Sequence, residues 1–235
     1  MRYIAKKEPP HELRRWSSEQ PVNDDGERIN CKYDDMPGAV KTVVKQHLLE
    51  EQGYLCCYTG IYISDERSHI EHFKPQSRCE GYEDIAYDNL LAAYPGGNQA
   101  RSLFGAHAKA DWYDPDLMIS PLIENCDKRF RFNQFGKIAP VHQTDMAARE
   151  TITRLGLDHD SLTDMRRQAI QTALFRNKQP LTEKALERII QSYCEPHSHS
   201  RHIRPFCFVI QQAAVDLLNR QRKIREKKRY RKKRK

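Results

Sequence analysis

The feature that most constrains this chain is a short apolar segment, His69-Ile70-Glu71-His72-Phe73, which ends at Lys74-Pro75. Its aromatic and β-branched residues favour a strand, and the proline favours a strand end because it has no N–H to donate. An asparagine, Asn89, follows 17 residues after His72 and directly precedes the apolar pair Leu90-Leu91. A carboxylate beside a histidine, followed by a loop and an asparagine, suits proton transfer and cation binding.

The three polar side chains have complementary chemistry. His72 has an ordinary pKa of about 6.5, close to neutral pH, so it can take a proton from water. Glu71 offers a carboxylate to a hard cation such as Mg²⁺. In a straight strand the two residues point to opposite faces, so the strand must end or bend near Pro75 for both to reach one site. Asn89 can hydrogen-bond backbone groups and thereby fix the loop.

The first two-thirds of the chain predict a mixture of helix and strand. Apolar residues recur every three or four positions from about Gly38 to Gln52, which indicates a helix that stops at Gly53. Residues 54–63 are typical of a hairpin or knuckle, and residues 130–138 of a hairpin that turns at 133–136. The pattern over 98–112 is mixed helical, and the apolar run 117–123 is expected to be extended.

From Thr144 the pattern changes to helices, of which we predict four. The first starts near Met146 and ends near Gly156, and the second covers about 161–176. The third begins after Thr182, a typical N-cap residue, and ends near Tyr193. The fourth covers 206–218.

We therefore predict an α+β protein with a central core of mixed helix and strand and a helical domain. The expected divisions are an N-terminal arm (1–37), a core domain (38–143), a helical domain (144–219) and a basic tail (220–235). The arm has too few apolar residues to fold alone, so it packs on the body or on a partner. Within it, residues 2–4 can form a strand and residues 12–16 one or two helical turns.

Positive charge is concentrated at the C-terminus. Residues 220–235 hold 12 Lys/Arg and one Glu, a net charge of +11, whereas the other 219 residues carry a net charge of −3. A cationic tail of this kind neutralises phosphates and binds nucleic acid without regard to its sequence. The alternative is a disordered, solubilising end. As to its structure, the tail either continues the last helix as a charged helix or frays.

Composition also bears on location. The seven cysteines show no disulfide framework, the N-terminus lacks a signal-peptide pattern, and no apolar run is long enough to span a membrane. We expect a cytoplasmic protein with reduced thiols and no membrane partner.

At residues 53–122 the chain resembles HNH (His-Me finger, ββα-metal) nucleases. More narrowly, the His69–Ser77 string with Tyr87–Leu91 is similar to the PtuB nucleases of Septu-type anti-phage systems, some of which are associated with retrons. The segments 119–122, 135–138 and 151–157 also look like that family. The resemblance implies a ββα-metal core and a metal-dependent endonuclease.

The resemblance also implies roles for individual residues. His72 matches the general base, Glu71 the acid beside the metal, and Asn89 the middle asparagine of the motif. The third motif residue, a metal ligand, is either Asn98 at the usual spacing or His107 if the loop is longer. Cations expected to contact nucleic acid lie near this motif and in the tail: Lys74, Arg101, Lys109, Arg229, Lys232 and Lys233.

For cofactors, the resemblance implies Mg²⁺, with Mn²⁺ as an alternative. Many relatives also hold a structural zinc with two Cys-x-x-Cys-like pairs. Here the four positions are Cys56, Thr59, Tyr94 and Gly97. One cysteine cannot assemble a tetrahedral zinc site, so we predict no structural zinc, with Tyr94 and apolar neighbours filling the space.

The resulting expectation is an endonuclease effector of an anti-phage complex. Its implied partners are a PtuA-like ATPase that controls it and a DNA or RNA substrate; a retron reverse transcriptase with its reverse-transcribed DNA is a further possible partner. The competing interpretation is a nucleic-acid-binding subunit without catalytic activity, in which the core is a scaffold and the tail binds.

Overall fold

The structure, a computed structural model, describes residues 1–97, 101–196 and 200–233. Helices and small antiparallel sheets together confirm the predicted α+β class. One buried apolar cluster includes residues from Met1 to Leu218, so the arm, the central segment and the C-terminal helices share a core. No helix in the described ranges is both long and apolar enough to cross a membrane.

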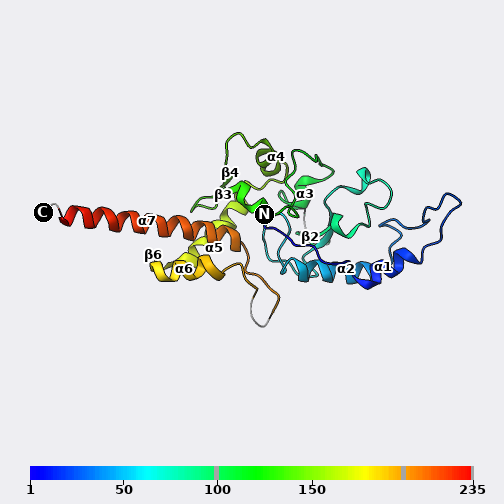
Figure 1. Cartoon of the computed structure of the whole chain (residues 1–235), viewed down its shortest axis with the longest axis horizontal. Coiled ribbons are helices and arrows are strands. Elements are labelled where there is room, and N and C mark those ends of the chain that lie inside the picture. Colours follow the sequence, from blue (N-terminus) through cyan, green and yellow to red (C-terminus); the bar gives the residue numbers. More distant parts are fainter. Residues whose placement is uncertain (98–100, 197–199, 234–235) are drawn as a thin grey trace.

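The N-terminal arm packs on the body. Met1 and Ile4 are buried, and the Ile4 N–H donates to the Pro121 carbonyl (2.8 Å). Residues 2–4 do not form the predicted strand, because this contact is an isolated hydrogen bond without a ladder. Helix α1 (His11–Ser18) follows, and the chain then extends away from the body before returning to α2 (Gly38–Glu51), as Figure 1 shows.

The central sheet pairs β1 (His69–His72) with β2 (Leu90–Ala93) in antiparallel register. All four β2 residues are buried, as expected of a strand packed on both faces. Two 3₁₀ turns, Gln76–Arg78 and Tyr87–Asn89, lie in the connection between the strands.

The predicted knuckle at 54–63 is confirmed as a tight turn closed by one bridge between Leu55 and Tyr62. Its Gly60 has φ +74°, and a Cβ there would lie 2.6 Å from the Phe208 ring. The Gly60 carbonyl also accepts from the Phe206 N–H (3.0 Å). The knuckle is thus docked directly on the start of the last helix.

Helix is shorter than predicted between residues 101 and 112. Only α3 (Ala106–Lys109) forms in that stretch. The apolar run 117–123 forms no strand. Instead the Thr151 hydroxyl accepts from the Ile119 N–H (2.9 Å) and donates to the Leu117 carbonyl (3.2 Å). A side chain from a helix thus satisfies backbone groups that the sequence pattern assigns to a strand. A 3₁₀ turn, Cys126–Arg129, leads on to the next sheet.

The hairpin and the C-terminal helices are confirmed. Strands β3 (Phe130–Phe132) and β4 (Ile138–Pro140) pair across the predicted turn. The remaining elements are α4 (Met146–Arg154), α5 (Asp160–Leu174), β5 (Phe175–Arg176), β6 (Gln179–Pro180), α6 (Glu183–Ser192) and α7 (Cys207–Lys233). Thr182 caps α6, as expected, by accepting from the Ala185 N–H.

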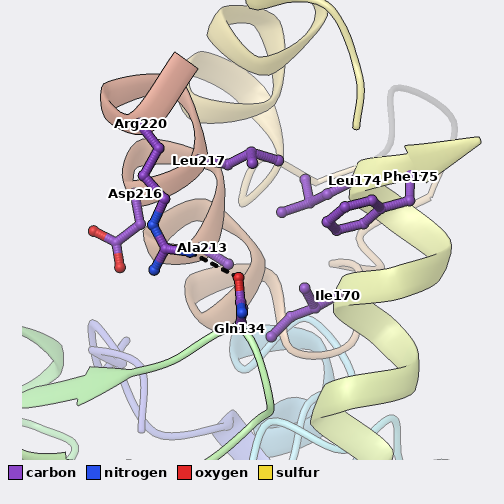
Figure 2. A pocket seen from close by; sticks show the side chains of 8 residues that line it. All are labelled: Gln134, Ile170, Leu174, Phe175, Ala213, Asp216, Leu217 and Arg220. Atoms are coloured by element: carbon purple, nitrogen blue, oxygen red, sulfur yellow. Dashed lines mark hydrogen bonds between the residues drawn. The ribbon is translucent and has the colours of Figure 1, made fainter. Parts of the chain in front are cut away.

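Helix α7 joins the core to the basic tail. Its first turns are buried, with Val209 and Ala214 at 0% exposure, and its last turns project beyond the body (Figure 1). The boundary is at Arg220, where Nη1 donates to the Gln134 amide oxygen (2.8 Å) beside a small apolar cavity between α5 and α7 (Figure 2). The tail thus continues the last helix, one of the two predicted states.

Candidate functional site

The alternation of strand β1 divides its polar residues between two faces. Glu71 pairs with Leu91 and His72 with Leu90. Because successive side chains point to opposite faces, Glu71 shares its face with His69, and His72 points the other way. The strand does not bend enough to bring Glu71 and His72 into one pocket.

Glu71 lies in an open pocket of about 470 Å³ between β1 and α3. Its lining combines two acidic residues, two histidines and an arginine with small residues; Arg101 and Asp111 are exposed. The lining residues are His69, Glu71, Arg101, Ala106, His107, Ala110 and Asp111. The pocket therefore collects two of the predicted site residues, Glu71 and His107. Arg101, predicted to contact nucleic acid, is on its rim.

Both carboxylate oxygens of Glu71 already have partners. Oε1 accepts from the Lys109 ammonium (2.9 Å) and from the Tyr58 hydroxyl (3.1 Å), and Oε2 lies 3.5 Å from His69 Nε2. Burial raises the pKa of Glu71, but the hydrogen bond from His69 and the charge of Lys109 outweigh it, and the pKa falls below its ordinary value. Glu71 is therefore ionised, and the ammonium of Lys109 compensates its negative charge.

The hydrogen bonds of the two histidines in the pocket fix where their protons lie. His69 Nδ1 must donate, because its partner is the Pro95 carbonyl (2.5 Å), so Nε2 can donate to Glu71 only when the ring is protonated. His107 Nδ1 must accept, because its partner is the Ser102 N–H (3.1 Å), so neutral His107 carries its proton on Nε2. The rings stack with centroids 5.6 Å apart.

His72 lies outside this pocket. Its side chain is largely buried, with 8% of the residue exposed, and Nε2 donates to the Asp84 carbonyl (2.9 Å). Tyr33 of the arm covers the ring edge-on, with centroids 4.5 Å apart, and the Tyr33 N–H donates to Asp84 Oδ2. Burial lowers the pKa of His72, which keeps the imidazole neutral with Nδ1 as its basic nitrogen.

Asn89 fixes the loop between the strands. Its Oδ1 accepts from the Lys74 N–H (2.7 Å), and its Nδ2 donates to the carbonyls of Lys74 (3.1 Å) and Glu83 (2.9 Å). Glu83 directly precedes Asp84, the residue that holds His72. Asn89 thus positions the His72 ring through the backbone.

The residues as they stand do not fit the predicted metal site. Glu71 is paired with Lys109, and His107 presents an N–H, not a lone pair, at Nε2. Within the described part of the chain, no three His, Cys, Asp or Glu side chains gather so that they could hold a metal ion. Asn98, the alternative ligand, lies outside the described residues. A divalent cation would have to displace Lys109 from Glu71.

The predicted nucleic-acid contacts are distributed unevenly. Lys74 pairs with Glu83 near the surface, and Arg229 lies on the projecting part of α7. Lys232 and Lys233 belong to the same helix. The prediction that Lys109 contacts nucleic acid does not fit its position, because its side chain is only 1% exposed.

Sequence reasoning missed His69 and Tyr58 as partners of Glu71. A signal was present for His69, because it is two residues before Glu71 and therefore on the same strand face. No local signal points to Tyr58, which reaches Glu71 from the knuckle. In the knuckle, Cys56 and Cys57 are buried, and next to Cys56 the Tyr94 ring stacks on Phe104.

Comparison with known proteins gives a distant relative. No family model matches the chain. A protein of Vibrio cholerae serotype O1 biovar El Tor, described as "Retron Vc95 putative HNH endonuclease", is 26% identical over 160 residues, which cover 63% of this chain and 76% of the relative. The chain is thus similar, at low identity, to an HNH endonuclease, in line with the resemblance drawn from its own motif.

Proposed function

We propose that this chain is an endonuclease that hydrolyses phosphodiester bonds beside strand β1, with β1, β2 and α3 as its ββα core. The observation that carries the proposal is the pocket that places Glu71, His69, His107 and Arg101 together. The buried, neutral His72 lies on the opposite face of the same strand. The similarity to a protein described as a retron HNH endonuclease supports it.

In this proposal, the pocket binds a phosphate and a strand histidine accepts the proton of water. The Arg101 guanidinium and the Nε2–H of His107 offer donors to phosphate oxygens. His72 is the base, because its ring is neutral and is oriented by the Asp84 carbonyl. For His72 to act on a phosphate in the pocket, the Tyr33 ring must move off it, and the end of β1 must turn so that the imidazole reaches the Glu71 face.

The proposed biological role is that of an effector in anti-phage defence. A nuclease of this kind harms its host if it is always active, so an ATPase partner of the PtuA type would control it. Retron components, a reverse transcriptase and its DNA product, are the further proposed partners. The covering of His72 by Tyr33 is compatible with an isolated protein of low activity.

The test compares wild type with His72→Gln, His69→Gln and Tyr33→Ala on single-stranded DNA, duplex DNA and transfer RNA, with Mg²⁺ and with chelator. Loss of a general base typically costs about 10²–10⁴ in rate, and we expect this for His72→Gln. We expect a smaller loss for His69→Gln and a gain for Tyr33→Ala. The exposed His142→Gln is the matched control.

Three outcomes would change this conclusion. A larger loss in His69→Gln than in His72→Gln would transfer the role of base to His69, which already lines the pocket. Equal cleavage by wild type and both histidine variants would reject catalysis at β1. Nucleic-acid binding with no cleavage under any condition, with the proposed partner present, would favour the non-catalytic subunit.

A further inference from the structure

The Lys109 ammonium is held by three oxygen atoms. Its Nζ lies 2.9 Å from Glu71 Oε1, 3.0 Å from the His72 carbonyl and 3.4 Å from the Ala110 carbonyl. The side chain is 1% exposed. An ammonium has three N–H donors, so each acceptor can take one. The charge and the donors of Lys109 are therefore satisfied inside the protein.

These three acceptors form an oxygen cage suited to a cation. Carboxylate and backbone carbonyl oxygens are the ligands that hard cations prefer in proteins. An ion buried without a partner is strongly unfavourable, so the cage and its cation stabilise each other. The cage also joins two elements, because Glu71 and His72 belong to β1, whereas Lys109 ends α3.

We propose that Lys109 is the resident cation of this site, taking at Glu71 the place of the divalent metal ion that the HNH resemblance implies. The strand and the helix are then joined by an ion pair instead of a metal. An added divalent cation at Glu71 would meet the repulsion of the ammonium, whose Nζ lies 2.9 Å from Oε1, and would find that oxygen already used. Removal of the ammonium, with the cage intact, creates a vacant oxygen site.

The inference rests on the proposed function only for the identity of the site, and its test measures cation binding, not cleavage. Mn²⁺ binding is followed by electron paramagnetic resonance, together with thermal unfolding with Mn²⁺ or with chelator. The proteins are full-length wild type, Lys109→Met, Lys109→Met with Glu71→Gln, and Glu71→Gln. The exposed Lys137→Met is the matched control.

We expect wild type and Lys137→Met to show no Glu71-dependent Mn²⁺ binding. Lys109→Met should have a lower Tm than wild type, and a hundredfold excess of Mn²⁺ over its Kd should raise that Tm by about 5–10 °C. The double variant should lose this gain. These results would support the proposal whether or not the protein cleaves nucleic acid.

The proposal is overturned if wild type binds one Mn²⁺ through Glu71 with a Kd within about twofold of that of Lys109→Met, a free-energy difference smaller than RT. It is also overturned if Lys109→Met folds and binds no Mn²⁺. If Lys109→Met does not fold, wild type against Glu71→Gln decides: Glu71-dependent Mn²⁺ binding rejects the proposal, and its absence supports it.

Discussion

Glu71 receives contacts from three separate segments of the chain, Tyr58 in the knuckle, His69 in its own strand and Lys109 in α3. The sequence identifies Glu71 as important, since an acid inside an apolar strand needs a partner. It does not identify those partners correctly, because a lysine is usually exposed and this one is buried by tertiary packing. The sequence pattern also grouped Glu71 with His72, although strand alternation separates them.

His69 predicts a pH dependence of stability. Burial lowers the pKa of His69, but the hydrogen bond to Glu71 and the Pro95 carbonyl outweigh it and raise the pKa above 6.5. The folded protein thus binds this proton more tightly than the unfolded chain. The resulting stability is complete below about pH 6.5 and is lost as pH rises through the raised pKa.

The measurement is urea unfolding of wild type and His69→Gln from about pH 5.5 to 8.5. Their difference in unfolding free energy should be largest at the acidic end and should shrink as pH rises. Using the difference cancels the opposite contribution of His72, whose pKa is lowered by burial. The contribution of His107 cancels only in part, because the charge of His69 also lowers its pKa. A difference that stays constant over the range would contradict the prediction.

At the scale of elements, periodic patterns were the reliable signals. Helix α2 starts and nearly ends where its apolar spacing predicted, and Thr182 caps α6 as its residue type predicted. The failures are elements that depend on distant contacts. The run 117–123 has a strand-like composition, but Thr151 from α4 satisfies its backbone, and one window of sequence does not contain that information.

Gly60 of the knuckle should be sensitive to substitution by alanine. In Gly60→Ala the alanine must adopt a positive φ, and its Cβ would lie 2.6 Å from the Phe208 ring. In Gly26→Ala the alanine must adopt a similar φ (+80°), but its Cβ would lie in open space. A positive φ costs an alanine about 1–2 kcal/mol, and overpacking adds about 1–3 kcal/mol. Chemical denaturation of both variants separates the two terms. Equal losses would show that the Phe208 contact costs nothing.

For the molecule as a whole, the basic segment and the proposed active site lie apart. The core with its pocket holds the proposed chemistry, and the basic end of α7 projects away from it (Figure 1). The start of the basic segment is still tied to the body, since Gln221 donates to the Leu181 carbonyl and Arg222 pairs with Glu187. The composition predicted where the charge is, but did not decide whether it is helical.

A chain that stops after Glu226 should lose nucleic-acid affinity and keep its fold. It keeps the contacts of Gln221 with Leu181 and of Arg222 with Glu187, and it removes eight basic residues. Each lost phosphate contact should reduce the slope of log K against log salt by about 0.7–0.9. Binding titrations at several salt concentrations measure this slope, and circular dichroism checks the fold. An unchanged slope would mean that this segment is not the electrostatic anchor.

The continuity of α7 has one more consequence. Each residue of a helix is rotated about 100° from the one before it, and the first turns of α7 are locked in the core. The direction in which the basic side chains from Arg220 to Arg229 point is therefore set by residues far from the tail. One residue inserted after Asn219 would turn the whole basic segment by about 100° without changing its charge. The number of basic residues and the direction in which they point can therefore be changed independently in this one helix.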